Sequence, residues 1–291
     1  MVVAGGLGKR YGRVQALQDL SLRVEEGEVF GFLGPNGAGK TTTIRLLLGL
    51  LRPTAGTAEV LGAPAGRAGT RARADIGYLP GELSLWPTFT GRQTLDFLAR
   101  LTGRAAVDRV DMIALLGLSA HELDRPVRTY SDGMKQKIGI VQALQCRPKL
   151  VFLDEPTKGL DPLMQQGFYE LLLRARGNGT TVFFSSHVLP EVERVADRVG
   201  MLRGGRLVVT GTMTDVRRTQ RRRVRARFAE PVDAAPLAHF GELVHREAAS
   251  VELLVAQADL PALVTRIGLL PLTDLTIEPP SLEDVFLEQY R

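Results

Sequence analysis

The sequence predicts an α/β fold in which a mostly parallel sheet is covered by helices, and three observations support this prediction. Residues 28–33, 149–153 and 180–184 are short and almost continuously apolar, which is typical of strands buried on both faces. Stretches with helical periodicity separate these runs, as the crossover connections of a parallel sheet require. Polar residues directly follow each run, and ligands of such sheets bind beyond the carboxyl ends of the strands.

Length and composition fit one large domain with a smaller one appended. The chain has 291 residues, of which 44% are hydrophobic and 24% charged, as in folded globular proteins. No segment approaches the ~18 consecutive apolar residues of a transmembrane helix, and the first residues lack the pattern of a signal peptide. The single cysteine, Cys146, cannot form an intramolecular disulfide, which fits a reducing cytoplasm.

The strand–helix alternation occupies residues 1–220, which we expect to form one domain. Within it, residues from about 82 to 147 are expected to form an inserted helical subdomain. Leu95, Leu98 and Leu101 recur there at helical spacing, and a second periodic stretch follows.

Residues 221–291 are expected to form a small α+β domain. Apolar residues alternate with arginines at its start, and further apolar strands flank a helical stretch. The strands are predicted near residues 224–228, 251–255 and 273–277, and the helix near residues 260–267. Ser281 and Asp284 have the spacing of a capping box and predict a last helix.

The positive charge is concentrated in one tract. The net charge is +5, and residues 217–227 hold seven arginines and no acid, so the rest of the chain carries −2 once those seven charges are subtracted. A nearly neutral remainder argues against a broad nucleic-acid footprint. The alternation in the tract favours a solvated strand face. Contact with anionic lipid headgroups and nucleic-acid binding are the alternatives, in that order.

One loop matches the pattern that binds nucleotide phosphates, with every spacing correct. Its residues are Gly34, Pro35, Asn36, Gly37, Ala38, Gly39, Lys40 and Thr41, and Thr42 continues into the next helical run. Glycines let the backbone wrap closely around phosphate, and the helix directs its positive dipole end at the anion. Lys40 adds a full positive charge, and the Thr41 hydroxyl suits a Mg²⁺ ligand. A plain glycine-rich turn is the alternative, but the preceding buried strand and following helix argue against it.

Two acids and a histidine follow the other two apolar runs. Asp154 suits Mg²⁺ held through water, and Glu155 suits a general base for attack of water on the γ-phosphate. A helix-capping pair before Pro156 is the alternative interpretation of these acids. His187 ends the third run, where it could donate a hydrogen bond to the γ-phosphate and help to hold Glu155. No guanine-specifying Asn-Lys-x-Asp sequence occurs, so ATP is the preferred nucleotide.

Further motifs accompany these residues in a fixed order. They are residues 130–137 (Tyr-Ser-Asp-Gly-Met-Lys-Gln-Lys), 154–157 (Asp-Glu-Pro-Thr), 159–161 (Gly-Leu-Asp) and 185–187 (Ser-Ser-His). In order and spacing, the set resembles the ATP-binding-cassette (ABC) family over roughly residues 7–211. Residues 130–137 are similar to the family's signature motif, which usually reads Leu-Ser-Gly-Gly-Gln.

The resemblance implies a head-to-tail dimer, either a homodimer or a pair with a second cassette. ATP would lie between one subunit's phosphate loop and the other subunit's signature motif. Ser131 and Gly133 would contact the γ-phosphate across the interface, where Asp161 would also lie. Tyr11 matches the aromatic residue that stacks on adenine in the family.

The resemblance also implies an ATPase that uses Mg²⁺ and powers a separate integral membrane permease. The chain would be peripheral, on the cytoplasmic face of the cell membrane, and no nucleic-acid partner is expected. The closing residues 280–286 are similar to the end of an accessory domain found in drug- and antibiotic-export subunits. An exporter of drugs or other hydrophobic compounds is therefore expected.

The chain departs from the family pattern at two places. Gly81 and then Glu82 stand where the family usually has a glutamine after a strand, and glycine cannot ligate Mg²⁺. In the signature motif, Asp132 replaces a glycine and Met134 replaces glutamine, and the charge of Asp132 predicts that it points away from the phosphates. Trp86 follows the first departure and is expected either to contact the permease or to be buried in the helical subdomain.

Two other functional classes remain open at this point. One is a soluble cassette protein acting on ribosomes or DNA, but those generally carry two cassettes or a long coiled-coil insertion. The other is a switch that binds ATP without turnover, which the missing glutamine favours slightly and the intact Glu155 and His187 oppose.

Overall fold

The computed structural model describes residues 1–66, 73–215 and 221–278. Two predictions lie outside the described residues: the last helix, after Ser281, and the part of the arginine tract that holds Arg217 and Arg218. The chain divides into two compact units, Met1–Gly211 and Thr212–Arg291, and each is described by itself.

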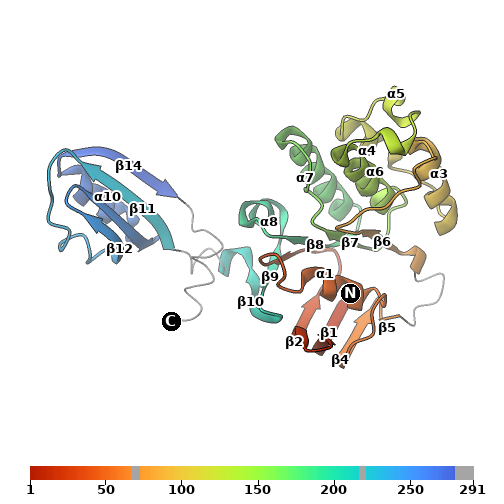
Figure 1. The fold of residues 1–291 in the computed structure, drawn as a ribbon, viewed down its shortest axis with the longest axis horizontal. Coiled ribbons are helices and arrows are strands. Elements are labelled where there is room, and N and C mark those ends of the chain that lie inside the picture. Colours follow the sequence, from red (N-terminus) through yellow and green to blue (C-terminus); the bar gives the residue numbers. More distant parts are fainter. Residues whose placement is uncertain (67–72, 216–220, 279–291) are drawn as a thin grey trace. The chain divides into compact units, whose positions relative to one another are not determined.

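A six-stranded sheet forms the centre of the first unit (Figure 1). In sheet order, its strands are β10 (Arg206–Thr212), β9 (Arg198–Arg203), β3 (Val29–Leu33), β8 (Thr181–Ser186), β7 (Leu150–Asp154) and β6 (Ile76–Leu79). From β9 to β6 all neighbouring strands are parallel, and every residue of β3, β7 and β8 is buried. The predicted mostly parallel sheet is confirmed, and its three apolar runs are neighbouring strands.

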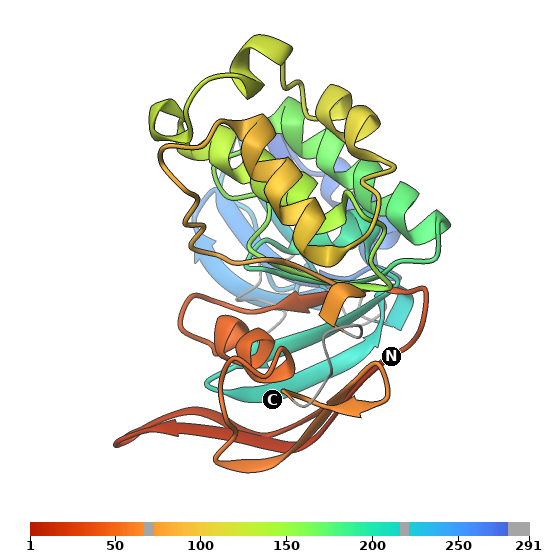
Figure 2. The same cartoon turned by 90° about the vertical axis from the view of Figure 1, so that its right-hand side faces the viewer.

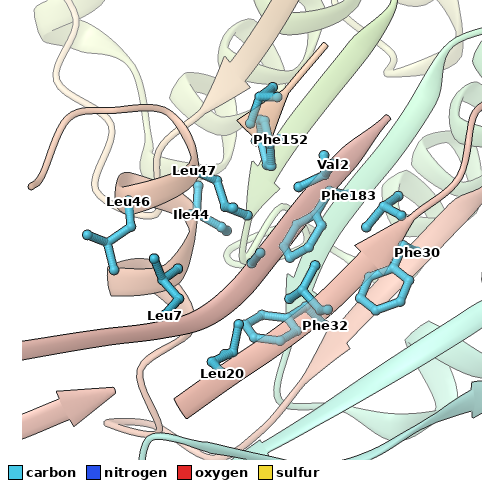
Figure 3. Packing of buried hydrophobic residues seen from close by; sticks show 14 of the residues in the cluster. Val2, Leu7, Leu20, Phe30, Phe32, Ile44, Leu46, Leu47, Phe152 and Phe183 are labelled. Carbon is cyan, nitrogen blue, oxygen red and sulfur yellow. The ribbon is translucent and has the colours of Figure 1, made fainter. Parts of the chain in front are cut away.

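A second, antiparallel sheet lies in the same unit and was not predicted. Its strands, in order, are β2 (Val14–Val24), β1 (Val2–Tyr11), β4 (Ala55–Val60) and β5 (Ala63–Pro64). Helix α1 (Lys40–Leu47) lies between the two sheets (Figure 2). The main core fills this space, where Phe183 packs against Phe30 and Phe32 with ring centroids 5.5 and 5.2 Å apart (Figure 3). This core anchors the strand ends and the start of α1.

A run of helices lies between β6 and β7, where the inserted helical subdomain was expected. Its elements are α3 (Gly91–Thr102), α4 (Arg109–Leu115), α5 (Ala120–Leu123), the 3₁₀ turn η1 (Val127–Thr129) and α6 (Asp132–Leu144). Helix α3 begins with a capping box, because Thr90 accepts from the Gln93 backbone and the Gln93 side chain accepts from the Thr90 backbone. Helices α7 (Pro162–Gly177) and α8 (Leu189–Val195) complete the unit. Within the described ranges, no helix has the length and apolar character needed to cross a bilayer.

The second unit is a four-stranded antiparallel sheet with one helix. In sheet order, its elements are β12 (Gly241–Glu247), β13 (Ser250–Ala256), β11 (Arg221–Phe228) and β14 (Leu272–Glu278), together with α10 (Leu260–Gly268). One sheet face packs on α10 and forms a core that includes Val224, Leu253, Leu263 and Ile267. Strand β12 was not predicted.

Arg221, Arg223, Arg225 and Arg227 of β11 alternate with its core residues and so lie on the opposite sheet face. Acids of the neighbouring strands pair with three of them. Arg221 is 3.0 Å from Glu242 of β12, and Arg223 pairs with Glu252 of β13. Arg225 pairs with the same Glu252 at 3.1 Å and lies 3.5 Å from Glu278 of β14. Three arginines of the predicted basic face are therefore paired with acids, which favours the solvated-face interpretation over lipid or nucleic-acid contact.

Candidate nucleotide site

Three neighbouring strands of the central sheet end at the same level. Parallel pairing sets Leu33 of β3 beside Ser186 of β8, and Asp154 of β7 beside Ser185 of β8. The backbone N–H of Gly34 donates to the Ser186 carbonyl at 3.2 Å, which fixes the start of the glycine loop against β8. The register of the sheet thus gathers the polar residues that follow each apolar run.

The glycine loop leads into α1 with a backbone that favours glycine. Gly37 and Gly39 have φ angles of 79° and 109°, in the left-handed region that side chains rarely adopt. A Cβ on Gly39 would also lie 2.7 Å from the Ala16 carbonyl of β2. Helix α1 has no side-chain cap and no acid in its first turn, so its first N–H groups and its positive dipole end are available to an anion.

The remaining predicted residues of the loop differ in how far they are exposed to solvent. Pro35 and Asn36 are exposed, Ala38 is buried, and Thr41 and Thr42 are partly buried in the first turn of α1. Because both threonines follow Lys40 directly, their hydroxyls and backbone N–H groups belong to the open end of the helix.

Lys40 is almost fully buried and is held by the loop that it follows. Its Nζ donates to the Gly34 carbonyl at 2.6 Å and to the Pro35 carbonyl at 3.3 Å. The same nitrogen lies 2.9 Å from Glu155 Oε1. A buried ammonium group needs such partners, and together they place a positive charge beside the amino-terminal end of α1.

Glu155 connects Lys40 to His187. Its Oε1 pairs with Lys40 as an ion pair without accepting a well-angled hydrogen bond, and its Oε2 lies 2.7 Å from His187 Nδ1. Glu155 itself adopts a φ of 51°, an uncommon conformation for a residue with a side chain and one that clusters at functional sites. The three predicted catalytic residues therefore form one chain of contacts.

Asp154 is fully buried beside these contacts, and one of its two carboxylate oxygens accepts a hydrogen bond. Its Oδ1 accepts from Ser185 Oγ at 2.6 Å, whereas Oδ2 is buried and has no hydrogen-bond partner among the described residues. Burial, and after it the Asp154 charge, raises the pKa of Tyr78 on β6. Buried polar atoms are normally paired, so the free oxygen indicates a position meant for a ligand.

Ser185 and Gln136 are two residues of the site to which sequence analysis gave no role. The Ser185 hydroxyl accepts from the Glu155 backbone N–H at 3.0 Å while it donates to Asp154. The Gln136 amide, on α6, donates to the Glu155 carbonyl at 3.3 Å and to the Pro156 carbonyl at 2.9 Å. The alignment of Ser185 with Asp154 across two parallel strands was the signal that could have identified it.

The signature residues lie at the start of α6, where Ser131 is the N-cap. The Asp132 side chain is 95% exposed and pairs with Lys135 at 3.0 Å, so it points to solvent. Gly133 lies against the loop after β7, because a Cβ on it would be 2.7 Å from the Gly159 carbonyl. No hydrogen bond or ion pair among the described residues joins Ser131 or Gly133 to the phosphate loop.

Two more predicted site residues are Asp161 and Tyr11. Asp161 caps α7 by accepting from the Met164 backbone at 2.9 Å. Tyr11 ends β1, is half-exposed, and has the Lys9 ammonium 5.1 Å from its ring centroid. Its hairpin touches the phosphate loop through Ala16, as noted above.

The departure after β6 lies beside Asp154. A Cβ on Gly81 would be 3.1 Å from Asp154 Oδ2, so any side chain there would press on the free oxygen. Glu82 is exposed, and within the described residues none of the hydrogen bonds or ion pairs involves it. Gly81 is therefore the closer of the two residues to the metal position predicted at Asp154.

Trp86 lies on the surface of the helical subdomain with two phenylalanines. Its ring is 5.0 Å from that of Phe97 and 5.7 Å from that of Phe89. Trp86 is 43% exposed and Phe97 is 38% exposed. Of the two expectations for Trp86, the structure favours an exposed aromatic patch over burial in the core.

Family models match both units of the chain. The model for ABC transporters covers residues 17–158. The model for the EvrA-like ABC transporter C-terminal domain covers residues 220–278.

Curated relatives agree with these matches. An uncharacterised ABC transporter ATP-binding protein of Nostoc is 42% identical over 209 residues, which are 70% of this chain and 62% of that protein. The linearmycin resistance ATP-binding protein LnrL of Bacillus subtilis is 36% identical over 74% and 70% of the two lengths. The daunorubicin resistance ATP-binding protein DrrA3 of Streptomyces coeruleorubidus is 38% identical, over 74% of this chain and 69% of that protein. The chain thus spans less than two thirds of the Nostoc relative.

The fold agrees with a solved structure as well. The ATP-binding subunit of an ABC transporter is 30% identical, with a TM-score of 0.69 over 75% of this chain and 92% of that one. The fold and the site therefore define a P-loop ATPase cassette with a small additional domain. The chain belongs to the family of ABC transporter ATP-binding proteins.

Proposed function

We propose that this chain binds ATP with Mg²⁺, hydrolyses it, and uses the energy to drive a separate membrane permease that exports drugs or other hydrophobic compounds. The observation that carries the proposal is the contact chain from Lys40 through Glu155 to His187, beside a buried Asp154 oxygen that has no partner. A buried carboxylate oxygen without a partner is costly unless a ligand uses it.

Lys40, Glu155 and His187 each have a distinct role in the proposed hydrolysis. Lys40 and the amino-terminal N–H groups of α1 neutralise the phosphates. Glu155 takes a proton from the attacking water, since a carboxylate is a suitable general base. His187 orients the Glu155 carboxylate and donates a hydrogen bond toward the γ-phosphate.

The residues beside Glu155 fit Mg²⁺. Asp154 Oδ2 is a free buried carboxylate oxygen, and Thr41 adds a hydroxyl in the first turn of α1. Within the described residues there is no cluster of three or more potential metal ligands among His, Cys, Asp and Glu. Mg²⁺ is commonly held by one or two carboxylates together with substrate phosphates. When bound, the ion would stabilise the negative charge on the oxygens of those phosphates.

The proposal includes pairing of two cassettes, either as a homodimer or with a second cassette. Ser131 is exposed and is the N-cap of the 13-residue helix α6, so it lies at the helix end that carries the positive dipole charge. A second cassette would supply Ser131 and Gly133 to the ATP held by the first, with Asp161 near the contact.

The partner proposed is an integral membrane permease, with this chain on the cytoplasmic face of the membrane. The patch of Trp86, Phe89 and Phe97 supports a protein partner, because exposed aromatic clusters mark interaction surfaces. Drug export is supported by the names of LnrL and DrrA3, which are resistance proteins. The pairing of the β11 arginines with acids argues against a nucleic-acid partner.

An ATPase assay of the purified chain, alone and with membranes that contain the candidate permease, tests the proposal. We expect Mg²⁺-dependent phosphate release that the membranes increase. The Trp86→Ser variant is expected to keep the basal rate and lose the increase. ATP binding without phosphate release under both conditions would instead support the binding-only switch.

A further inference from the structure

The backbone at Glu155 is held in an unfavourable conformation. Its φ of 51° lies in the left-handed region, which costs of order 1 kcal/mol or more for a residue with a side chain and persists only when surrounding contacts enforce it. This backbone conformation decides where the Glu155 carboxylate lies between Lys40 and His187. The contacts that enforce it therefore also position the catalytic base.

Two side chains hold the backbone around Glu155 from opposite directions. The hydroxyl of Ser185, on the neighbouring strand, accepts a hydrogen bond from the backbone N–H of Glu155. The side-chain amide of Gln136 donates to the backbone carbonyls of Glu155 and of the next residue, Pro156. The Gln136 side chain is only 8% exposed, so solvent does not readily replace these two hydrogen bonds.

Gln136 comes from the helix that carries the signature motif. Helix α6 begins after Ser131, and Gln136 lies one turn further on. On the same helix, Gly133 packs directly against the Gly159 carbonyl. The start of α6 is thus joined to the loop after β7 by a buried pair of hydrogen bonds and a close backbone contact.

We propose that Gln136 is a positioning residue for ATP hydrolysis: by holding the Glu155 and Pro156 carbonyls, it keeps the Glu155 carboxylate in place and links that placement to the helix of the signature motif. This inference rests on the proposed role of Glu155 as the base. Gln136 does not touch the reacting atoms, and it acts through the backbone of Glu155. A shift of α6 changes the position of the base through this link.

The test uses Gln136→Met, which keeps the length of the side chain and removes both donors. The matched control is Gln142→Met, on the same helix, whose amide donates to the Tyr78 carbonyl at 2.6 Å and not to the loop of Glu155. We expect Gln136→Met to lower kcat by about tenfold or more, the scale on which small misplacements of a catalytic group act. The KM for ATP should not change, and Gln142→Met should keep the wild-type kcat.

A double-mutant cycle separates positioning from a general loss of structure. In the Glu155→Gln background, single-turnover hydrolysis should not fall further when Gln136→Met is added, because the base is already absent. Equal losses in both backgrounds, a wild-type kcat for Gln136→Met, or the same loss in Gln142→Met would each overturn the inference. If Gln136→Met does not fold, Gln136→Glu replaces it, since a carboxylate cannot donate to either carbonyl. A wild-type rate for Glu155→Gln alone would instead contradict the proposed function.

Discussion

The two units contain the same kinds of charged side chain in opposite arrangements. In the first unit, Lys40 is buried in the first turn of α1 and Asp154 is buried at the end of β7, and one Asp154 oxygen has no hydrogen-bond partner among the described residues. In the second unit, Arg225 lies on an open sheet face and is paired with both Glu252 and Glu278. The comparison teaches that completeness of pairing, and not the number of charges, separates a ligand site from a solvated surface.

Removing the base should give the largest effect. We expect Glu155→Gln to lower ATP turnover by at least ~100-fold, the scale of lost acid–base catalysis. ATP binding should remain, because the amide keeps the shape of the side chain and Lys40 keeps its contacts to the loop carbonyls. Steady-state phosphate release and equilibrium nucleotide binding measure the two effects. Wild-type turnover would mean that another residue is the base.

Removing the Ser185 hydroxyl should give an intermediate effect. Ser185→Ala leaves Asp154 Oδ1 and the Glu155 N–H without the hydroxyl that pairs with both of them. Unpaired buried groups cost ~1–3 kcal/mol each, so we expect the free energy of unfolding to fall by about that amount. Turnover should fall as well. The control is Ser84→Ala, an exposed serine in the loop after β6, and equal behaviour of the two variants would contradict the role given to Ser185.

Removing an acid from the arginine face should give the smallest effect. Glu252→Gln takes one partner from Arg223 and Arg225, and we expect the second unit to lose ~1 kcal/mol of unfolding free energy, the upper end for partly exposed ion pairs. ATP turnover should not change. Glu230→Gln, an exposed acid beyond the end of β11, is the matched control. A large loss of ATPase activity in Glu252→Gln would contradict the separation between a solvated face and a ligand site.

Local sequence was enough to predict the central strands and the phosphate loop. Strands β3, β7 and β8 are buried throughout, so each is an unbroken apolar run, and the spacing of glycines with Lys40 specifies the loop. The antiparallel sheet was not predicted because glycines and bulges interrupt the alternation of β1, where Gly6 has a φ of 58°. Strand β12 was missed because most of its residues are exposed.

Contacts between distant segments could not be predicted in the same way. Gln136 reaches Pro156 only because α6 packs beside β7, and no spacing in the sequence shows this. The partners of the arginines are likewise set by strand register, since Glu252 lies opposite Arg225 in the paired strands. A pattern of single residues indicates a charged face, but the pairing of strands decides whether that face is neutral.

The most direct test of the central claim is calorimetric titration of the chain with ATP in the presence and absence of Mg²⁺, compared with the Lys40→Ala variant. The account predicts saturable binding that Mg²⁺ strengthens and that Lys40→Ala abolishes, because the buried charges of Lys40 and Asp154 belong to the proposed nucleotide site. Absence of binding to the unaltered chain, or equal binding by Lys40→Ala, would contradict it.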